Sequence, residues 1–164
     1  MTDLATDLTA RVIRRDDCDT STLGATTNQF FIDAESTKGR VSLVGHFITP
    51  RSLAAPMHLH EREDEFSFIM TGQVAAISGG HELLAGPGEL LVKPRGEWHT
   101  FWNPGDEPAT LLEIISPAGV EKLFRSFAAG VPTPEALMDM AAEYGCQVDF
   151  AATMQLAASK DLSM

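Results

Sequence analysis

Cysteine is scarce in this sequence, and long hydrophobic runs are absent from it. The two cysteines, Cys18 and Cys146, lie near opposite ends of the chain and form neither a disulfide framework nor a paired-thiolate metal motif. No apolar stretch approaches the roughly 18 residues that a membrane-spanning helix needs. The N-terminal segment has early acidic residues and lacks the basic start and apolar core of a secretory signal. We therefore expect a cytoplasmic protein with two ordinary thiols and no membrane partner.

Basic residues are also few. Asp and Glu outnumber Lys and Arg by 23 to 12, which gives a formal net charge of -11. A chain of this charge would repel a polyanionic phosphate backbone, so nucleic acid is not expected as a partner. The 164 residues, of which 44% are hydrophobic, are enough for one domain with a core but too few for two. We predict a single domain over residues 1–164.

Short β-prone runs separated by turn residues fill residues 27–118. Glycine, proline, asparagine and aspartate recur between the runs, where a hairpin must reverse its direction. The pattern predicts a mainly antiparallel sandwich or barrel. The predicted strands are Asn28–Ile32, Arg40–Thr49, Glu65–Thr71, Gln73–Ser78, Glu89–Val92, Trp98–Trp102 and Ala109–Ile115.

The character of the chain changes after Pro117, and we predict helices within residues 119–150. Apolar residues spaced three and four apart favour helices over Val120–Ala129 and Pro134–Tyr144. Thr133 can cap the second helix, and Gly145 stands where a left-handed C-terminal cap is needed. The two ends of the chain, residues 1–10 and 151–164, are predicted to be flexible.

Four residues form a candidate metal site. His58 and His60 are two positions apart, so on an extended strand both imidazoles point to the same face. Glu65 follows after a short acidic turn that can bring its carboxylate back toward them, and His99 enters a later strand through the tight turn at Pro94 and Gly96. Three imidazoles and one carboxylate suit a first-row transition metal better than calcium or magnesium.

The alternative for the first pair is simple solvation, since histidines two apart on a surface strand commonly contact only water. The later segment from Pro94 to Asn103, which contains His99, favours the metal interpretation. Two other histidines are weaker candidates: His81 lies in a polar turn, and His46 lies in a strand whose inward face is uncertain. The acidic run of Glu61, Glu63 and Asp64 is most simply a solvated loop.

Both segments resemble the cupin family. The stretch His58-x-His60-x4-Glu65-x6-Gly72 is similar to the first cupin motif, and Gly88-x5-Pro94-x-Gly96-x2-His99-x3-Asn103 is similar to the second. One departure is Ser52, which stands where the first motif usually begins with glycine. The short spacing between the motifs, residues 73–87, is typical of small microbial cupins. The tail after Ser116 is also similar, more weakly, to bacterial quercetin 2,3-dioxygenase-like cupins.

The resemblance implies a jelly-roll β-barrel with a short C-terminal helical appendage. It implies that one divalent transition metal (Fe, Mn, Ni, Co, Cu or Zn) is held by His58, His60, Glu65 and His99. It further implies that Glu65 acts as catalytic base in a quercetinase-like reaction of an enol or flavonol with dioxygen. A redox-neutral isomerase or lyase, and a non-catalytic small-molecule-binding cupin, remain alternatives. Exposed barrel edges together with the resemblance favour a homodimer.

Strand alternation predicts the wall of the substrate pocket. An inward Glu65 brings Ser67 and Ile69 inward, and an inward His99 brings Phe101. Such an apolar wall suits a planar aromatic or enol better than a small dianion such as oxalate, which would require a nearby Arg or Lys. Plain core filling is the alternative for Ile69 and Phe101. Trp98 and Trp102 should lie on the opposite face and pack against the other sheet, the helices or a partner subunit.

Overall fold

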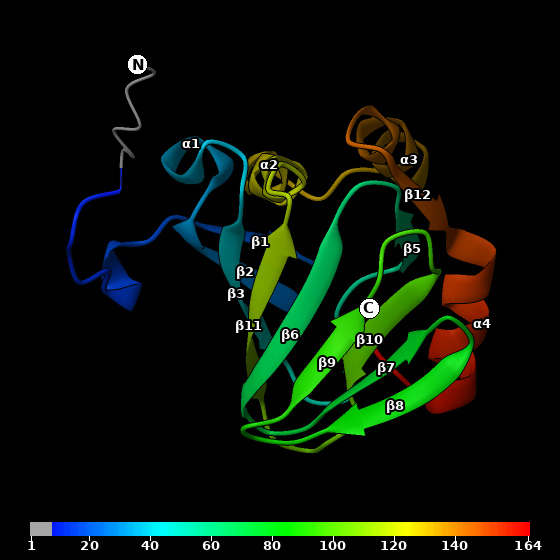
Figure 1. Cartoon of the computed structure of the whole chain (residues 1–164). Coiled ribbons are helices and arrows are strands. Elements are labelled where there is room, and N and C mark those ends of the chain that lie inside the picture. Colours follow the sequence, from blue (N-terminus) through cyan, green and yellow to red (C-terminus); the bar gives the residue numbers. More distant parts are fainter. Residues whose placement is uncertain (1–7) are drawn as a thin grey trace.

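The computed structural model describes residues 8–164 and is built mainly from antiparallel strands. Figure 1 shows the strands as two facing layers, with helices at one end and along one side. The helical elements are η1 (Arg15–Asp17), α1 (Ala34–Thr37), α2 (Glu121–Ser126), η2 (Phe127–Ala129), α3 (Pro134–Glu143) and α4 (Phe150–Lys160). The strands are β1 (Thr20–Leu23), β2 (Thr26–Ile32), β3 (Ser42–Ile48), β4 (Ser52–Leu53), β5 (Met57–His60), β6 (Asp64–Thr71), β7 (Val74–Ser78), β8 (His81–Ala85), β9 (Leu90–Lys93), β10 (His99–Asn103), β11 (Ala109–Ser116) and β12 (Cys146–Asp149).

Two six-stranded sheets face each other. One has the order β1-β2-β3-β11-β6-β9, and the other is the path β12-β5-β10-β7-β8 with β4 paired to β10. Alternate residues of the strands point inward, as the burial of alternate residues along β11 shows. Ile48, Ile69, Phe101 and Leu111 fill the middle of the barrel. The predicted mainly-β barrel with C-terminal helices is therefore confirmed.

Glycines with positive φ close several of the predicted turns. Gly72 has φ of 72°, and a Cβ atom there would lie 2.8 Å from Cα of Ala109. This position therefore requires glycine for its backbone conformation and for its close approach to β11. Gly79 and Gly80, both with positive φ, form the β7–β8 hairpin.

Five strands lie outside the predicted ranges, namely β1, β4, β5, β8 and β12, although His58 and His60 of β5 were expected on an extended strand. β1 begins at Thr20, so the barrel starts earlier than residue 27, and β12 adds a strand to the sheet edge beside β5. β8 was predicted only as a turn around His81. Its first four residues are all exposed, so it lacks the alternation that identifies a half-buried strand.

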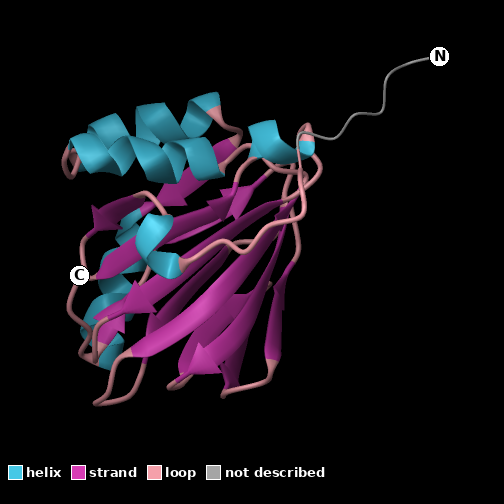
Figure 2. Cartoon of the chain, turned by 90° about the vertical axis from the view of Figure 1, so that its left-hand side faces the viewer, coloured by secondary structure: helices cyan, strands magenta, loops and turns pink. Residues whose placement is uncertain are grey.

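The helical segment from α2 to α3 closes one end of the barrel (Figure 2). Thr133 accepts a hydrogen bond from the backbone N–H of Ala136, and Pro134 stands in the first turn of α3, as predicted. Gly145 follows the helix with φ of 70°. Leu123, Phe127 and Leu137 pack in one apolar cluster with residues of β2, β3 and β11. Figure 2 shows these helices lying across the ends of the strands.

The prediction that residues 151–164 are flexible is wrong. Residues 150–160 form α4, which Asp149 caps by accepting a hydrogen bond from the backbone N–H of Ala152. Leu156 packs with Leu53, Ala75 and Trp102 on the outside of the second sheet. The prediction that residues 1–10 are flexible concerns mostly residues 1–7, which lie outside the described part of the chain.

We expect Leu156→Ala to lower the free energy of unfolding by about 2–3 kcal/mol, because it leaves a cavity beside the buried indole of Trp102. Met154→Ala on the same helix is the control. Its side chain is 55% exposed, so we expect a change within about 0.5 kcal/mol. Urea titrations followed by tryptophan fluorescence measure both, and equal effects would contradict the packing of α4.

Within residues 8–164, no helix has both the length and the apolar character that crossing a bilayer would require.

Candidate metal centre

His58, His60, Glu65 and His99 come together at the inner surface of the barrel. His58 and His60 project from the same face of β5, Glu65 lies at the start of β6, and His99 opens β10, where it pairs with His58. One possible ligand atom from each residue lies within 4.8 Å of those of the others, and all four side chains are buried. The strand register thus brings to one point four residues that span 42 positions in the sequence, from 58 to 99.

Backbone carbonyls orient two of the imidazoles. Nδ1 of His58 lies 2.7 Å from the carbonyl oxygen of Pro56, and Nδ1 of His99 lies 3.0 Å from that of Glu97. Since a carbonyl oxygen only accepts, each Nδ1 is the protonated donor, and each Nε2 keeps its lone pair. Nitrogen atoms prepared in this way are typical of metal-binding histidines.

The remaining nitrogen atoms of the cluster have unusual surroundings. Nε2 of His60 and Nε2 of His99 are buried without a hydrogen-bond partner, although buried polar atoms are almost always paired. They lie 3.2 Å and 3.3 Å from the two carboxylate oxygens of Glu65. These unsatisfied atoms and the chemistry of the donor set fit a single first-row transition-metal ion.

The sequence analysis predicted that Glu63 lies in a solvated loop, but its side chain is buried. It is 4% exposed, and its Oε2 lies 3.9 Å from Nδ1 of His60 without another partner. This distance is too long for a hydrogen bond, so Glu63 acts on His60 through its charge. Its neighbour Asp64 instead pairs with Arg95 at the surface, and this ion pair lowers the pKa of Asp64 to about 2.

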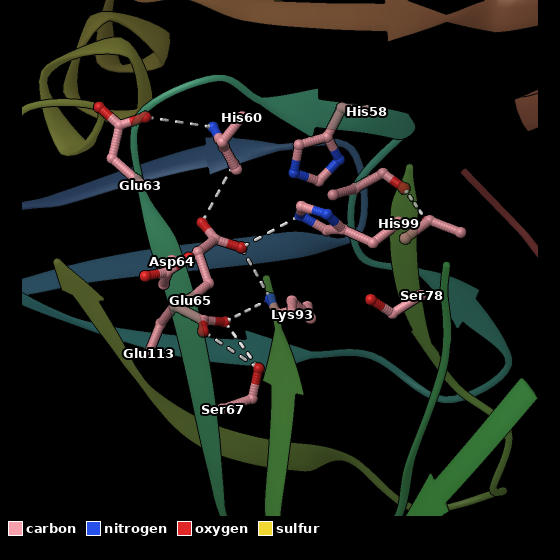
Figure 3. Close-up of polar contacts among 12 residues, drawn as sticks. His58, His60, Glu63, Asp64, Glu65, Ser67, Ser78, Lys93, His99 and Glu113 are labelled. Atoms are coloured by element: carbon pink, nitrogen blue, oxygen red, sulfur yellow. Dashed lines mark hydrogen bonds and ion pairs between the residues drawn. The ribbon is translucent and has the colours of Figure 1, made fainter. Parts of the chain in front are cut away.

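Lys93 and Glu113 are two buried charged residues next to the cluster that the sequence did not predict. Nζ of Lys93 lies 2.9 Å from Glu65 and 2.9 Å from Glu113, and Ser67 donates a hydrogen bond to Glu113 at 2.8 Å. Figure 3 shows Lys93 between the two carboxylates. Strand alternation offered a signal, because Lys93 follows Leu91 on the inward face of β9 and Glu113 follows Leu111 on that of β11.

These charges set the protonation of the cluster. Burial alone would raise the pKa of Glu65, but the Lys93 ammonium and the His60 imidazole hold it well below its usual range. Burial alone would lower the pKa of His60, but the Glu65 carboxylate raises it to about 10. Burial lowers the pKa of His58 and of His99. Without a metal, one imidazole of the three therefore holds a proton beside an ionised carboxylate.

A cavity extends from this cluster toward the C-terminal helices. Its wall includes His58, His60 and Glu65 at one end, and it is otherwise mostly apolar, with Leu123, Phe124, Phe127 and Leu137 contributed by the helical segment. Of the three predicted pocket residues, Phe101 lines this cavity. Ser67 is fully buried against Glu113, and Ile69 is packed in the barrel core, so neither lies in this wall.

Two residues of the wall received little weight in the sequence analysis. His46 points inward from β3 and lines the cavity, and Cys146 on β12 lines it beside His60, with which it is paired in the sheet. Of the two tryptophans, Trp102 is buried against α4, whereas Trp98 is 39% exposed. His81 begins β8 and is exposed, as expected of a solvated histidine.

Comparison with known proteins agrees with the fold. Residues 47–115 match the family described as Cupin domain. A solved structure of a predicted oxalate decarboxylase from Thermotoga maritima is 18% identical, with a TM-score of 0.61 over 65% of this chain and 99% of that one. The polyketide cyclase RemF from Streptomyces resistomycificus is 25% identical, with a TM-score of 0.56 over 66% of this chain and 80% of its own. The match over residues 47–115 and the two antiparallel sheets therefore show a mainly-β cupin fold, in which a buried cluster of three histidines and one glutamate is consistent with one metal ion.

One similar protein is a plant protein. The Rhicadhesin receptor of Pisum sativum is 33% identical over 98 residues, which cover 55% of this chain and 45% of that protein. The match thus spans less than half the length of this relative. The proteins compared carry names of quite different activities, so the shared fold alone does not specify a reaction.

Proposed function

We propose that the protein is a metal-dependent enzyme that acts on a small planar enol, flavonol or phenol, with dioxygen as co-substrate. The observation that supports this most directly is the position of the three-histidine, one-glutamate cluster at the inner end of an apolar cavity. A bound transition metal would supply Lewis acidity and open coordination positions for a chelating substrate and for dioxygen.

In this proposal the metal ligands and the cavity wall have separate roles. His58, His60, His99 and Glu65 hold the metal, and the apolar wall with Phe101 and Phe124 binds a planar ligand and excludes water. Lys93 is engaged by Glu65 and Glu113, so it is not available to pair with an anionic substrate. This favours a neutral planar substrate over a dianion such as oxalate.

The role of Glu65 as a base receives less support than its role as a ligand. Its Oε2 is 2.9 Å from Nζ of Lys93, and this contact stabilises the ionised carboxylate. A carboxylate stabilised in this way accepts a proton less readily than a free one. In this proposal Glu65 therefore acts first as the anionic ligand that offsets the charge of the metal.

The proposal predicts consumption of dioxygen. Protein reconstituted separately with Fe, Mn, Co or Ni should consume dioxygen when quercetin or a simpler flavonol is added, and Glu65→Gln should reduce the rate by at least about 100-fold. An oxygen electrode and absorption spectroscopy of the flavonol measure this. Inactivity of every metal form with every enol tested would contradict the proposal.

A redox-neutral reaction is the second candidate. The similarity to RemF, whose name describes a polyketide cyclase, favours it, because a cyclisation by itself needs no oxidant. The same four ligands can polarise a carbonyl without any oxidant. Conversion of an enol substrate at the same rate under strict anaerobiosis would support this candidate and exclude the dioxygenase.

A further inference from the structure

His46 is a polar group in an otherwise apolar part of the cavity. It lies in the middle of β3, where it pairs with Asn28 on β2 and with Leu111 on β11. Its side chain is 7% exposed, and its ring centroid lies 5.7 Å from that of Phe101. Phe101 also contacts Lys93, whose Nζ is 4.3 Å from the centre of the same ring. Phe101 thus contacts both His46 and Lys93, and His46 lines the same cavity as the ligands His58, His60 and Glu65.

A chain of hydrogen bonds determines which nitrogen of His46 carries the proton. Ser21 Oγ lies 2.6 Å from the carbonyl oxygen of Phe124 and must donate to it. Asn28 Nδ2 donates to Ser21 Oγ at 3.1 Å, so Asn28 Oδ1 faces His46. That oxygen, 2.8 Å from Nδ1 of His46, can only accept. Nδ1 is therefore protonated, and Nε2 carries a lone pair.

In the described part of the chain, the lone pair of Nε2 has no hydrogen-bond partner. Among residues 8–164, the contacts of His46 are this hydrogen bond and the rings of Phe101 and Phe124. Burial and the Lys93 ammonium lower the pKa of His46 to about 3, so the ring stays neutral near neutral pH. A neutral acceptor with a fixed tautomer, which faces an apolar cavity, is selective for a hydrogen-bond donor.

We propose that Nε2 of His46 accepts a hydrogen bond from a hydroxyl group of the substrate, remote from the chelating part of that substrate. The proposal rests on the proposed function and narrows its substrate class. The preferred enol or flavonol carries a second hydroxyl, separated from its metal-binding atoms by an aromatic ring that packs against Phe101. His46 is then a specificity-determining residue, and Asn28 and Ser21 position it.

Two ligands test this. Flavonol has only the chelating hydroxyl–carbonyl pair, whereas quercetin has further hydroxyls. With zinc-loaded protein, which avoids turnover, we expect quercetin to bind about 10-fold more tightly than flavonol, the contribution of one buried hydrogen bond. In His46→Phe the preference should disappear while the affinity for flavonol changes less than about 3-fold. His81→Phe, at an exposed position, should keep the full preference.

The outcomes separate the two proposals. If both ligands bind and His46→Phe retains the preference for quercetin, the role of His46 is wrong and the proposed substrate class stands. If neither ligand binds zinc-loaded protein, the proposed substrate class is wrong. His46 is then tested by ¹⁵N NMR of the histidine rings with phenol as the probe. A shift of the unprotonated Nε2 resonance of His46 supports the proposal, and an unchanged resonance or a protonated Nε2 overturns it.

Discussion

His58→Ala should lower the affinity of the protein for divalent transition metals by more than about 100-fold, since even the loss of an outer-shell partner costs 10- to 100-fold. The substitution removes one of four ligands whose donor atoms lie within 4.8 Å of one another. Elemental analysis after reconstitution and desalting, together with chelator competition, measures the change. His81→Ala is the control, because that histidine is exposed on β8.

Circular dichroism would establish that the His58→Ala variant keeps its fold. A folded variant that retains metal like the wild type would contradict the site.

The affinity of the wild-type protein for metal should also rise with pH, because the pKa of His60 is raised to about 10 and a metal has to displace that proton. Calorimetric titrations in buffers of different ionisation enthalpy should show the release of a proton. Affinity independent of pH would show that His60 is neutral before metal binds.

Lys93→Met should destabilise the metal-free protein by about 3–5 kcal/mol, the usual cost of leaving a buried charge without its partner. Lys93 is fully buried and contacts the carboxylates of both Glu65 and Glu113 at 2.9 Å. Without it, at least one ionised carboxylate remains uncompensated inside the barrel. Urea denaturation of metal-free protein measures the loss. Metal-loaded protein should lose less, because the bound cation replaces part of the missing charge.

Lys122→Met is the matched control for this experiment. Lys122 forms an ion pair of 3.8 Å with Glu35, and both side chains are at least half exposed, so the change should be under about 1 kcal/mol. Adding Glu113→Gln to Lys93→Met should recover part of the lost stability, since it removes one of the two carboxylates. Equal effects of Lys93→Met and Lys122→Met would mean that the buried charges are not paired as the structure shows.

The inward-facing layer of the barrel explains why Lys93 matters to the site. Glu65 pairs with Lys93 across β6 and β9, and Ser67 pairs with Glu113 across β6 and β11. These pairs bring Lys93, Glu113 and Ser67 next to Glu65, on the inward face of the first sheet. The carboxylate that would bind the metal is therefore held by a protein cation before any metal arrives.

Two local motifs in the sequence predicted the four candidate ligands, and turn residues predicted most of the strands. The two-residue spacing of His58 and His60 sets a common face on any extended strand, and the turn glycines, such as Gly72, limit where a strand can reverse. The helix over Pro134–Glu143 followed from its cap and its apolar spacing. These features depend on residues close together in the chain, so they can be predicted without the tertiary structure.

Only the tertiary structure decided which side chains meet across strands and which segments are covered. Lys93, Glu113 and His46 lie on strands far apart in sequence, and a strand pattern does not tell which inward residues become neighbours. Residues 150–160 are ordered because Leu156 is packed against Trp102, a contact between distant parts of the chain. Thus the sequence by itself determined the four candidate ligands, whereas the contact of Lys93 with Glu65 and the place of His46 in the cavity wall arise from strand register, a non-local property.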